Sequence, residues 1–332
     1  MATTAKPKDI EALAAALTAG DRRALARAIT LVESSREDHR EAAERLLERL
    51  MTATGGAVRI GVSGAPGVGK STFIEAFGGH LTGLGHRIAV LAVDPSSARS
   101  GGSILGDKTR MPELARNGSA FIRPSPSGGT AGGVARRTRE AMLLVEAAGF
   151  EVVIVETVGV GQSELAVEDM VDTFLLLVAP GGGDELQGIK RGVMELADLV
   201  VVTKADGELE TPARHAAADY RSALTLIRPK ADFWRPEVCL VSALEGQGMP
   251  EVWEAVSRHA DGLKACGELA ARRQAQVGRW LWSEIEHGLR EAFTSDAAIA
   301  SALPDVEAEV AAGRLGPTQA ARRLLEVFRK RR

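Results

Sequence analysis

Short apolar runs recur through the middle of the chain, separated by more polar segments. The runs cover residues 58–63, 87–94, 119–124, 151–157, 172–180, 197–204 and 237–243. Their apolar positions are nearly continuous rather than alternating, which is typical of parallel strands covered on both faces. Segments with a helical pattern lie between most of these runs, as in right-handed β–α–β units. The pattern therefore predicts an α/β fold with a mostly parallel sheet flanked by helices.

The two ends of the chain have the periodicity of helices instead. In the stretch 43–50, apolar side chains recur three and four positions apart. Near the other end, a stripe recurs every four residues, formed by Val277, Leu281, Ile285, Leu289 and Phe293. We therefore expect an N-terminal helical extension (1–55), a sheet domain (56–262) and a C-terminal helical arm (263–332).

The apolar stripe of the arm lies outside a sheet domain that is already complete, so another surface has to cover it. A second subunit is one such surface, which makes a homodimer one expectation. Packing against residues 1–50 of the same chain is the alternative, and the pattern leaves both open.

Charge and composition exclude several classes of protein. The 332 residues carry a net charge of −3, so the chain lacks the broad basic field of a nucleic-acid-binding protein. The only cysteines, Cys239 and Cys266, form no metal-binding pair and suggest a reducing compartment. The N-terminus has no apolar signal core, and no run approaches the roughly 18 apolar residues that span a bilayer. We expect a cytoplasmic protein with neither nucleic acid nor a membrane as partner.

A glycine-rich loop follows the first predicted strand. Residues 64–71 read GAPGVGKS, the spacing G-x-x-x-x-G-K-[ST] of a phosphate-binding loop (P-loop), and a helical pattern follows. Its glycines let backbone N–H groups approach phosphates, and the helix N-terminus adds partial positive charge. Lys70 can reach the β- and γ-phosphates, and the Ser71 hydroxyl can bind Mg²⁺. The predicted nucleotide contacts are Gly64, Ala65, Pro66, Gly67, Val68, Gly69, Lys70, Ser71 and Thr72.

A second motif selects the base. Residues 203–206 read TKAD at the end of a predicted strand, where the Asp206 carboxylate can accept the N1–H and N2–H of guanine. Adenine lacks that pair of donors, so Asp206 favours GTP over ATP. The Lys204 stem can lie over the base plane. The motif departs from the usual Asn-Lys-x-Asp at Thr203, so we expect a weaker tie between this base loop and the P-loop.

The end of the last predicted strand supplies another candidate contact with the base. Ser242, Ala243 and Leu244 lie there, and their backbone N–H groups can meet the O6 atom of guanine. Each of these pieces is weak alone, but their order after a P-loop favours guanine nucleotides, GTP and GDP, as the ligands.

Acidic residues at the carboxyl ends of strands are candidate Mg²⁺ ligands. Asp94 and Glu156 lie at or near the ends of predicted strands that should both neighbour the P-loop strand. Asp107 lies in the Ser- and Gly-rich loop 94–111. Together with Ser71 they offer the oxygen ligands that Mg²⁺ prefers. The alternatives are a strand-end turn residue for Asp94 and an exposed loop acid for Asp107.

Three glycine-rich loops are expected around the same crevice, at residues 121–140, 156–164 and 180–192. A loop that is ordered by the γ-phosphate and released on hydrolysis acts as a switch. These loops therefore indicate a protein whose shape reports the state of its nucleotide.

Basic residues on such a loop can stabilise the transition state of phosphoryl transfer. Lys190 or Arg191 is a candidate for this role, and a solvated loop is the alternative. No residue stands out as the one that positions the attacking water, and Gln162 is a candidate only by its place in the chain. We therefore expect slow hydrolysis that a partner accelerates. The candidate catalytic residues are Lys70, Asp107, Glu156 and Lys190.

The motifs taken together closely resemble those of the MeaB-like GTPases, the G-protein chaperones of the adenosylcobalamin enzyme methylmalonyl-CoA mutase. The matching stretches are GAPGVGKST, DPSSARSGGSILGDKTRM, ETVGVGQSE, PGGGDELQGIKRG and VVVTKAD. The match runs through the whole GTPase domain, and the helical additions at both ends fit the family as well.

The resemblance implies properties that the spacing does not. Members of the family are homodimers, in which C-terminal helices form an arm between subunits. They bind the mutase, gate its loading with adenosylcobalamin and protect it from inactivation, and the mutase in turn speeds GTP hydrolysis. Ser71, Asp94, Asp107 and Glu156 match the family's Mg²⁺ positions, and the 180–192 loop matches a switch that responds to the partner.

Two other functions compete with this interpretation. A GTPase metallochaperone that delivers nickel needs clustered Cys and His ligands, whereas the six His are scattered here. A small-molecule kinase would use ATP and release a phosphorylated product, which Asp206 disfavours. A scaffold with a degenerate nucleotide site fits least, because Lys70 and Ser71 are both present.

Overall fold

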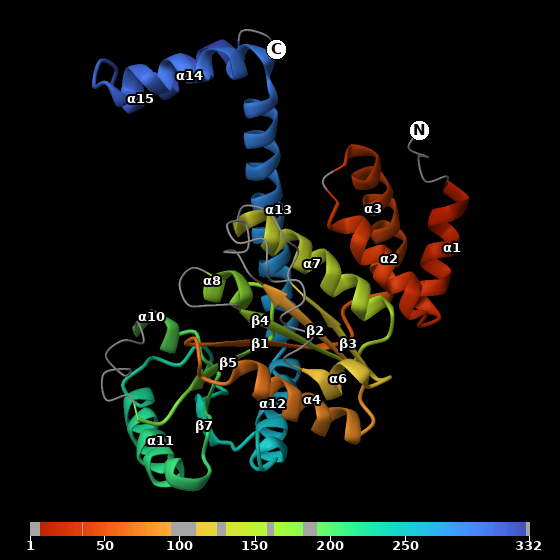
Figure 1. The fold of residues 1–332 in the computed structure, drawn as a ribbon, viewed down its shortest axis with the longest axis vertical. Coiled ribbons are helices and arrows are strands. Elements are labelled where there is room, and N and C mark those ends of the chain that lie inside the picture. Colours follow the sequence, from red (N-terminus) through yellow and green to blue (C-terminus); the bar gives the residue numbers. More distant parts are fainter. Residues whose placement is uncertain are drawn as a thin grey trace. The chain divides into compact units, whose positions relative to one another are not determined.

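The chain divides into two compact units, residues 1–276 and 277–332. The computed structural model describes residues 7–34, 36–93, 111–124, 131–157, 163–181 and 191–329, with the backbone alone at 7–8, 131–134, 163 and 191. Figure 1 shows the elements of both units, and each unit is described by itself below.

A seven-stranded sheet forms the centre of the first unit, with the strand order β3-β2-β4-β1-β5-β6-β7 (Figure 1). The strands are β1 (Val58–Gly64), β2 (Ile88–Val93), β3 (Ala120–Arg123), β4 (Val152–Thr157), β5 (Thr173–Val178), β6 (Leu199–Val202) and β7 (Glu237–Leu240). Every neighbouring pair is parallel. Each strand coincides closely with a predicted apolar run, so the α/β fold with a parallel sheet is confirmed. The carboxyl ends of the strands therefore meet at one edge of the sheet.

The expected neighbours of the P-loop strand are only half correct. β4, which carries Glu156, pairs directly with β1, with Val62 opposite Glu156. β2, which precedes Asp94, pairs with β4 and β3 and not with β1. The chain passes from β1 to β2 across a gap that β4 later fills, a long-range pairing that local patterns do not encode.

Helices cover both faces of this sheet. Those of the first unit are α1 (Pro7–Thr18), α2 (Arg22–Val32), α3 (Glu37–Leu50), α4 (Lys70–Gly83), α6 (Pro112–Arg116), α7 (Ala131–Ala147), α8 (Ser163–Glu168), α10 (Arg191–Met194), α11 (Glu210–Leu224), α12 (Met249–Ala265) and the start of α13 (Glu268–Ser295). Short 3₁₀ helices, η1 (Met51–Ala53) and η3 (Gly207–Leu209), precede β1 and α11.

Successive strand residues alternate between two cores, as the pleat of a strand requires. On β4, Val152 and Ile154 join the core beneath α4 and α12. Val153 and Val155 join the core beneath α7 and α8. Both sets are fully buried, which explains why the strands read as continuous apolar runs.

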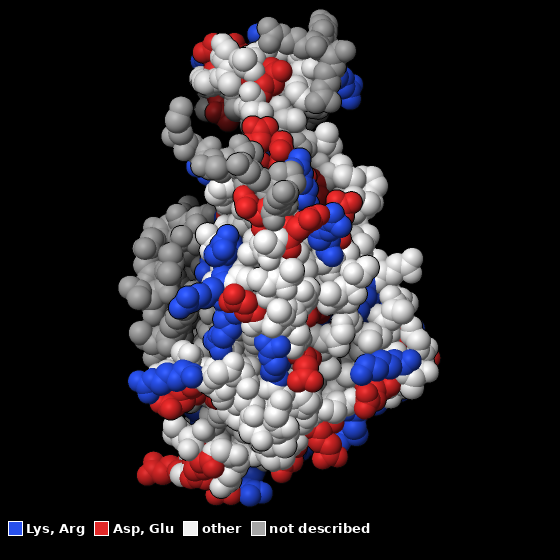
Figure 2. Space-filling view, turned by 90° about the vertical axis from the view of Figure 1, so that its right-hand side faces the viewer, with Lys and Arg blue, Asp and Glu red and all other residues white. Residues whose placement is uncertain are grey.

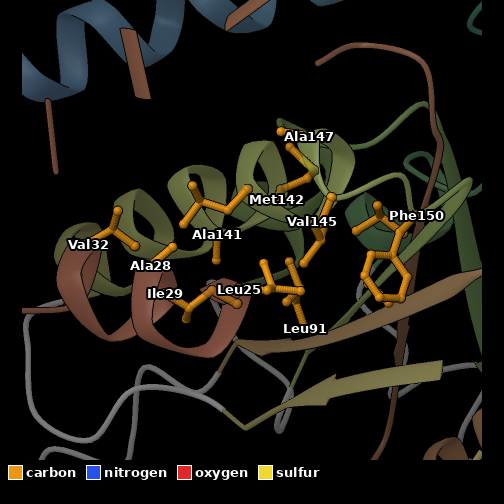
Figure 3. Close-up of a cluster of buried hydrophobic side chains, with 14 of the residues drawn as sticks. Leu25, Ala28, Ile29, Val32, Leu91, Ala141, Met142, Val145, Ala147 and Phe150 are labelled. Atoms are coloured by element: carbon orange, nitrogen blue, oxygen red, sulfur yellow. The ribbon is translucent and has the colours of Figure 1, made fainter. Parts of the chain in front are cut away.

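The N-terminal helical pattern forms α1, α2 and α3, which pack against α7. Figure 3 shows Leu25 and Ile29 of α2 facing Ala141 and Val145 of α7, with Leu91 of β2 beside them. These side chains belong to the same buried core as the sheet. The three helices therefore share a core with the sheet in the first unit.

The start of α13 is anchored at the amino edge of the sheet. Arg273 pairs with the Asp172 carboxylate just before β5, at 2.6 Å between Nη2 and Oδ2, and donates to the carbonyl oxygen of Ala57 at 2.7 Å. The buried Gln276 donates to the carbonyl oxygen of Val171 at 2.8 Å. Burial alone would lower the pKa of Arg273, but the hydrogen bond and charge of Asp172 raise it. The first turns of α13 are thus fixed to the segments that precede β1 and β5.

The second unit contains the rest of α13 with α14 (Ala297–Ala311) and α15 (Pro317–Arg329). The last two helices share a small core that includes Ile299 and Leu324, and the Phe293 and Phe328 rings meet edge to face at 5.3 Å. Asp296 caps α14 by accepting a hydrogen bond from the backbone N–H of Ala298 at 2.9 Å. The predicted C-terminal helices are therefore present.

Most of the predicted apolar stripe of α13 is exposed in the chain. Leu281 is 59% exposed and Leu289 57%, with Trp282 beside them at 65%. None of the helices in the described residues combines the length and apolar character that a membrane crossing needs.

Candidate nucleotide-binding site

The P-loop connects the end of β1 to the start of α4 (Figure 1). At Gly64 a Cβ atom would collide with the carbonyl oxygen of Leu177 on β5, so only glycine fits. Gly67 and Gly69 have φ angles of 81° and 98°, in the left-handed region that glycine adopts without strain. α4 begins at Lys70, so its N-terminal N–H groups lie at the end of the loop. The loop thus has the backbone of a phosphate cradle.

Lys70 lies across this cradle. Its Nζ donates to the carbonyl oxygens of Gly64 and Ala65, at 2.7 and 3.2 Å. The ammonium group is therefore held within the loop, where a bound phosphate would compete with these carbonyls for it.

Ser71 and Glu156, two of the predicted magnesium ligands, face each other. The Ser71 hydroxyl lies 3.5 Å from Oε1 of Glu156, a side chain that is buried at the end of β4. A hydroxyl beside a carboxylate is an oxygen donor set that suits Mg²⁺. The other two predicted ligands, Asp94 and Asp107, lie outside the described residues.

The predicted catalytic residues are therefore placed in part. Lys70 and Glu156 come from the P-loop and from the strand next to it, and both lie at the carboxyl edge. Lys190 and Gln162 lie outside the described residues, as do the middles of the three glycine-rich loops. Arg191 begins α10, and its side chain is not described.

The base loop is organised around Asp206. Its Oδ2 accepts a hydrogen bond from the Ser242 hydroxyl at 2.5 Å, which fixes the carboxylate that is predicted to read guanine. Lys204 has a φ angle of 56°, rare for a residue with a side chain, and such strain clusters at functional sites. A side-chain hydrogen bond thus links the segments that follow β6 and β7.

The hydrogen bond from the Ser242 hydroxyl to Asp206 was not predicted from the sequence. Sequence reasoning assigned its backbone N–H to the base, but that N–H donates to the carbonyl oxygen of Gln247 at 3.1 Å. The Ser242 hydroxyl is buried and also accepts a hydrogen bond from the N–H of Glu245 at 3.1 Å. Ala243 and Leu244 lie at the start of the turn that this pair closes, and the Leu244 side chain is 81% exposed.

The base loop and the P-loop are in direct contact. The Thr203 hydroxyl donates to the carbonyl oxygen of Val68 at 2.7 Å, and Lys204 Nζ donates to that of Gly67 at 2.9 Å. The tie that we expected Thr203 to weaken is therefore present. The Thr203 hydroxyl thus stands in for the asparagine amide of the usual motif. The sequence alone does not show that this hydroxyl reaches the Val68 carbonyl oxygen.

A cavity of about 640 Å³ opens beside the base loop, between β7, α11 and α12. Ala205 and Ser242 line it, but among the described residues its lining contains neither Asp206 nor a P-loop residue. The predicted nucleotide site at the carboxyl edge of the sheet is therefore distinct from this cavity.

The features of a metallochaperone are weak in the described part of the chain. No three His, Cys, Asp or Glu side chains there gather as a metal site. Burial raises the pKa of the Cys239 thiol to about 11, whereas a thiol must lose its proton to bind a metal.

Basic and acidic residues are mixed over the face drawn in Figure 2.

Comparison with known proteins agrees with this geometry. A Caulobacter vibrioides protein described as a GTPase is 58% identical over 320 residues, 96% of this chain and 98% of that protein. The mouse mitochondrial methylmalonic aciduria type A homolog is 50% identical, over 97% of this chain and 80% of that protein. The crystal structure of an LAO/AO transport system kinase superposes with a TM-score of 0.77 at 40% identity, covering 98% of this chain and 99% of that one.

A family model covers most of the chain as well. Residues 25–298 match the model of the methylmalonyl-CoA mutase-associated GTPase MeaB, a span that includes the P-loop, the base loop and the start of the arm. The chain therefore belongs to the MeaB family of GTPases.

Proposed function

We propose that this protein binds and hydrolyses GTP with Mg²⁺ and uses the nucleotide to control methylmalonyl-CoA mutase. In this proposal it acts as a chaperone that gates adenosylcobalamin loading and protects the mutase from inactivation. Residues 56–262 are the GTPase domain, 1–55 a helical extension and 263–332 a dimerisation arm. We place the protein in the cytoplasm.

One observation carries the nucleotide assignment. Asp206 is held by Ser242 at 2.5 Å, in a loop whose Thr203 and Lys204 side chains contact the P-loop. A fixed carboxylate beside a phosphate cradle suits a base with two adjacent N–H donors, which guanine has and adenine lacks. Ala243 and Leu244 then offer their backbone N–H groups to guanine O6.

The phosphates lie along residues 64–72, with Lys70 against the β- and γ-phosphates. Ser71 and Glu156 support Mg²⁺, and we assign Asp94 and Asp107 to the same ion, directly or through water. A Mg²⁺ ion held there would neutralise the negative charge that develops on the phosphates during hydrolysis. Lys190 and Asp107 complete the proposed catalytic set, and the protein hydrolyses GTP slowly without its partner.

The proposed partner follows from the family and from a named relative. The matching family model is described as mutase-associated, and the mouse relative is named for methylmalonic aciduria. We propose that the mutase contacts the glycine-rich loops and so responds to the nucleotide that is bound. We also propose that two copies of this chain pair through the apolar stripe of α13.

The base assignment is tested with an Asp206→Asn variant. The Asn amide keeps one acceptor oxygen but turns its NH₂ group toward the second guanine donor, so the affinity for GDP should fall about 10- to 100-fold. Xanthine carries a carbonyl oxygen where guanine carries its amino group, so the variant should gain affinity for xanthosine diphosphate relative to GDP. Titration with GDP, XDP and ADP by calorimetry measures all three.

The control is Glu208→Gln, which makes the same charge change at an exposed position two residues away. It should leave GDP affinity unchanged. The name of the solved relative, a transport system kinase, is the reason to include adenine nucleotides in the titration. Unchanged GDP affinity in Asp206→Asn, or tighter binding of ADP than GDP by the unmodified protein, would contradict the proposal.

A further inference from the structure

The strand β7 lies at one end of the sheet and pairs with β6 alone. Among the strands of the described residues it is the one without a buried residue, since all four of its residues are partly exposed. An edge strand leaves half of its backbone N–H and C=O groups without a partner strand, so another chain can pair with it. This edge is therefore a candidate docking surface.

The hydrogen bonds at the end of β7 show which of its backbone groups point outward. Val241, the residue after β7, uses its N–H and its C=O toward the end of β6 and the residues that follow it, at 2.9 and 3.0 Å. Because this direction alternates along a strand, Val238 and Leu240 face away from β6. Arg221 of α11 agrees with this, because its Nη2 donates to the carbonyl oxygen of Val238 at 3.3 Å.

Little competes for these outward groups. The bond from Arg221 is long and comes from an exposed side chain, so it is weak. Within the described residues, the N–H groups of Val238 and Leu240 have no acceptor outside the sheet. The carbonyl oxygen of Leu240 is covered by Gly248, where a Cβ atom would lie only 2.1 Å from it. Two N–H groups and one carbonyl oxygen are thus open to an extended segment.

A cavity lies at each end of this edge, and Val238 lines both. The cavity at the amino end of β7 has about 580 Å³ and lies against the end of α11. The cavity at the carboxyl end is the one of about 640 Å³ beside the base loop. Leu226 is 83% exposed, and its neighbours Thr225 and Ile227 line the cavity at the amino end. An unpaired edge with room for side chains at both ends suits the addition of a strand.

Three exposed arginines lie at the cavity at the amino end. Arg221 and Arg235 line it, and Arg228 lies between two of its lining residues. The described part of the chain gives none of the three an ion pair. Glu237, the acid among the described lining residues, is already paired with Arg258, at 2.7 Å between Oε2 and Nη2. This end of the edge is therefore complementary to carboxylates.

We propose that the edge of β7 is a docking site for an extended segment of a partner protein that carries acidic residues at one end. Its backbone pairs with Val238 and Leu240, and its carboxylates bind the three arginines. A carboxylate draws Arg221 away from the carbonyl oxygen of Val238, which then accepts an N–H from the segment. The acidic residues belong at one end only, because an exposed acid, Glu251, lines the other cavity.

A second copy of the chain is a poorer occupant of this edge. A strand of four residues is about 13 Å long, and pairing two of them buries far less than the roughly 800 Å² per partner of a stable interface. The docking site also goes beyond the proposed function, because neither its arginines nor Val238 and Leu240 belong to the predicted nucleotide contacts.

The test uses a fluorescein-labelled peptide, acetyl-EETVTVT-amide, in fluorescence anisotropy with the full chain. The peptide should bind saturably at low salt. The double variant Arg221→Gln, Arg235→Gln should bind it about tenfold more weakly, because it loses two charged partners. The control, Arg27→Gln with Arg45→Gln, makes the same charge change at exposed positions of the N-terminal helices and should bind it as the unmodified protein does.

A second peptide separates strand pairing from simple attraction between charges. It has the same sequence with N-methyl groups on its four central residues, which removes N–H donors and blocks pairing but keeps both carboxylates. It should bind the unmodified protein at least about tenfold more weakly than the first peptide.

Three results would overturn the proposal. One is the absence of saturable binding by the first peptide. Another is equal affinity for the two peptides, which would leave only a site for free anions. The third is a change of mass in light scattering for the Arg221→Gln, Arg235→Gln variant but not for its control, which would assign the edge to a second copy of the chain.

Discussion

His259 is a buried histidine at the amino end of the sheet, far along the strands from the P-loop. Its Nδ1 shares a hydrogen bond with the Thr173 hydroxyl at 2.8 Å, and the Trp234 ring lies 4.9 Å away between centroids. Burial lowers the pKa of His259 to about 4, even though the carboxylate of Asp198 acts in the opposite direction. The positive charges of Arg272 and Lys230 add to the lowering. His259 is therefore neutral in the folded protein near pH 7.

This environment predicts that stability falls in mild acid. The unfolded chain binds the His259 proton near pH 6.5, while the folded chain resists it until about pH 4, so the stability present above pH 6.5 is lost as the pH falls through this window. Between pH 7 and pH 5 this one residue should cost about 2 kcal/mol. Urea unfolding at the two pH values measures it.

Two histidine variants make the attribution specific. His259→Gln, which cannot take up the proton, should show a smaller difference between the two pH values. His215→Gln, at an exposed position, should keep the full difference. Equal pH dependence in all three proteins would show that His259 is not the cause.

At the scale of residues, the sequence predicted those parts of the site that depend on the spacing of neighbouring residues. The P-loop, Asp206 and Lys204 were all predicted because each motif is contiguous in the chain. The Ser242 hydroxyl on Asp206 and the Thr203 hydroxyl on Val68 were not, because each joins residues from separate strands. A residue type alone does not show which distant carbonyl or carboxylate its side chain will meet.

At the scale of elements, the strands were predicted but their order was not. Apolar runs identify β2 and β4 equally well, yet only β4 lies beside β1. The anchoring of α13 by Arg273 and Asp172 likewise lies between segments about a hundred residues apart, beyond the reach of periodicity. The start of α13 is thus fixed within the first unit, while its next turns present an apolar stripe.

The exposed stripe of α13 is the element on which the proposed dimer depends. A Leu281→Glu, Leu289→Glu double variant should remain folded, because both side chains are exposed in the chain. It should become monomeric, with a dissociation constant raised at least about 100-fold, because each buried leucine contributes about 1.5–3 kcal/mol. Light scattering coupled to size exclusion measures the mass.

Arg290→Glu is the control, since it adds an acid to an exposed polar position of the same helix. This variant should stay dimeric. If the double variant has the same mass as the unmodified protein, the stripe is not the interface.

At the scale of the whole molecule, the chain combines a nucleotide site with helices on both sides of the GTPase sequence. The loop contacts that fix the P-loop and the base loop come from the first unit alone. The second unit has a small core of its own between α14 and α15.

The central claim is that GTP hydrolysis here is coupled to methylmalonyl-CoA mutase. The most direct measurement is GTP turnover with Mg²⁺, with and without purified apo- and holo-mutase, using Lys70→Ala as the inactive control. We expect slow turnover alone, faster turnover with mutase, and none above background in the variant. An unchanged rate in the presence of mutase, with no complex on size exclusion, would contradict the account.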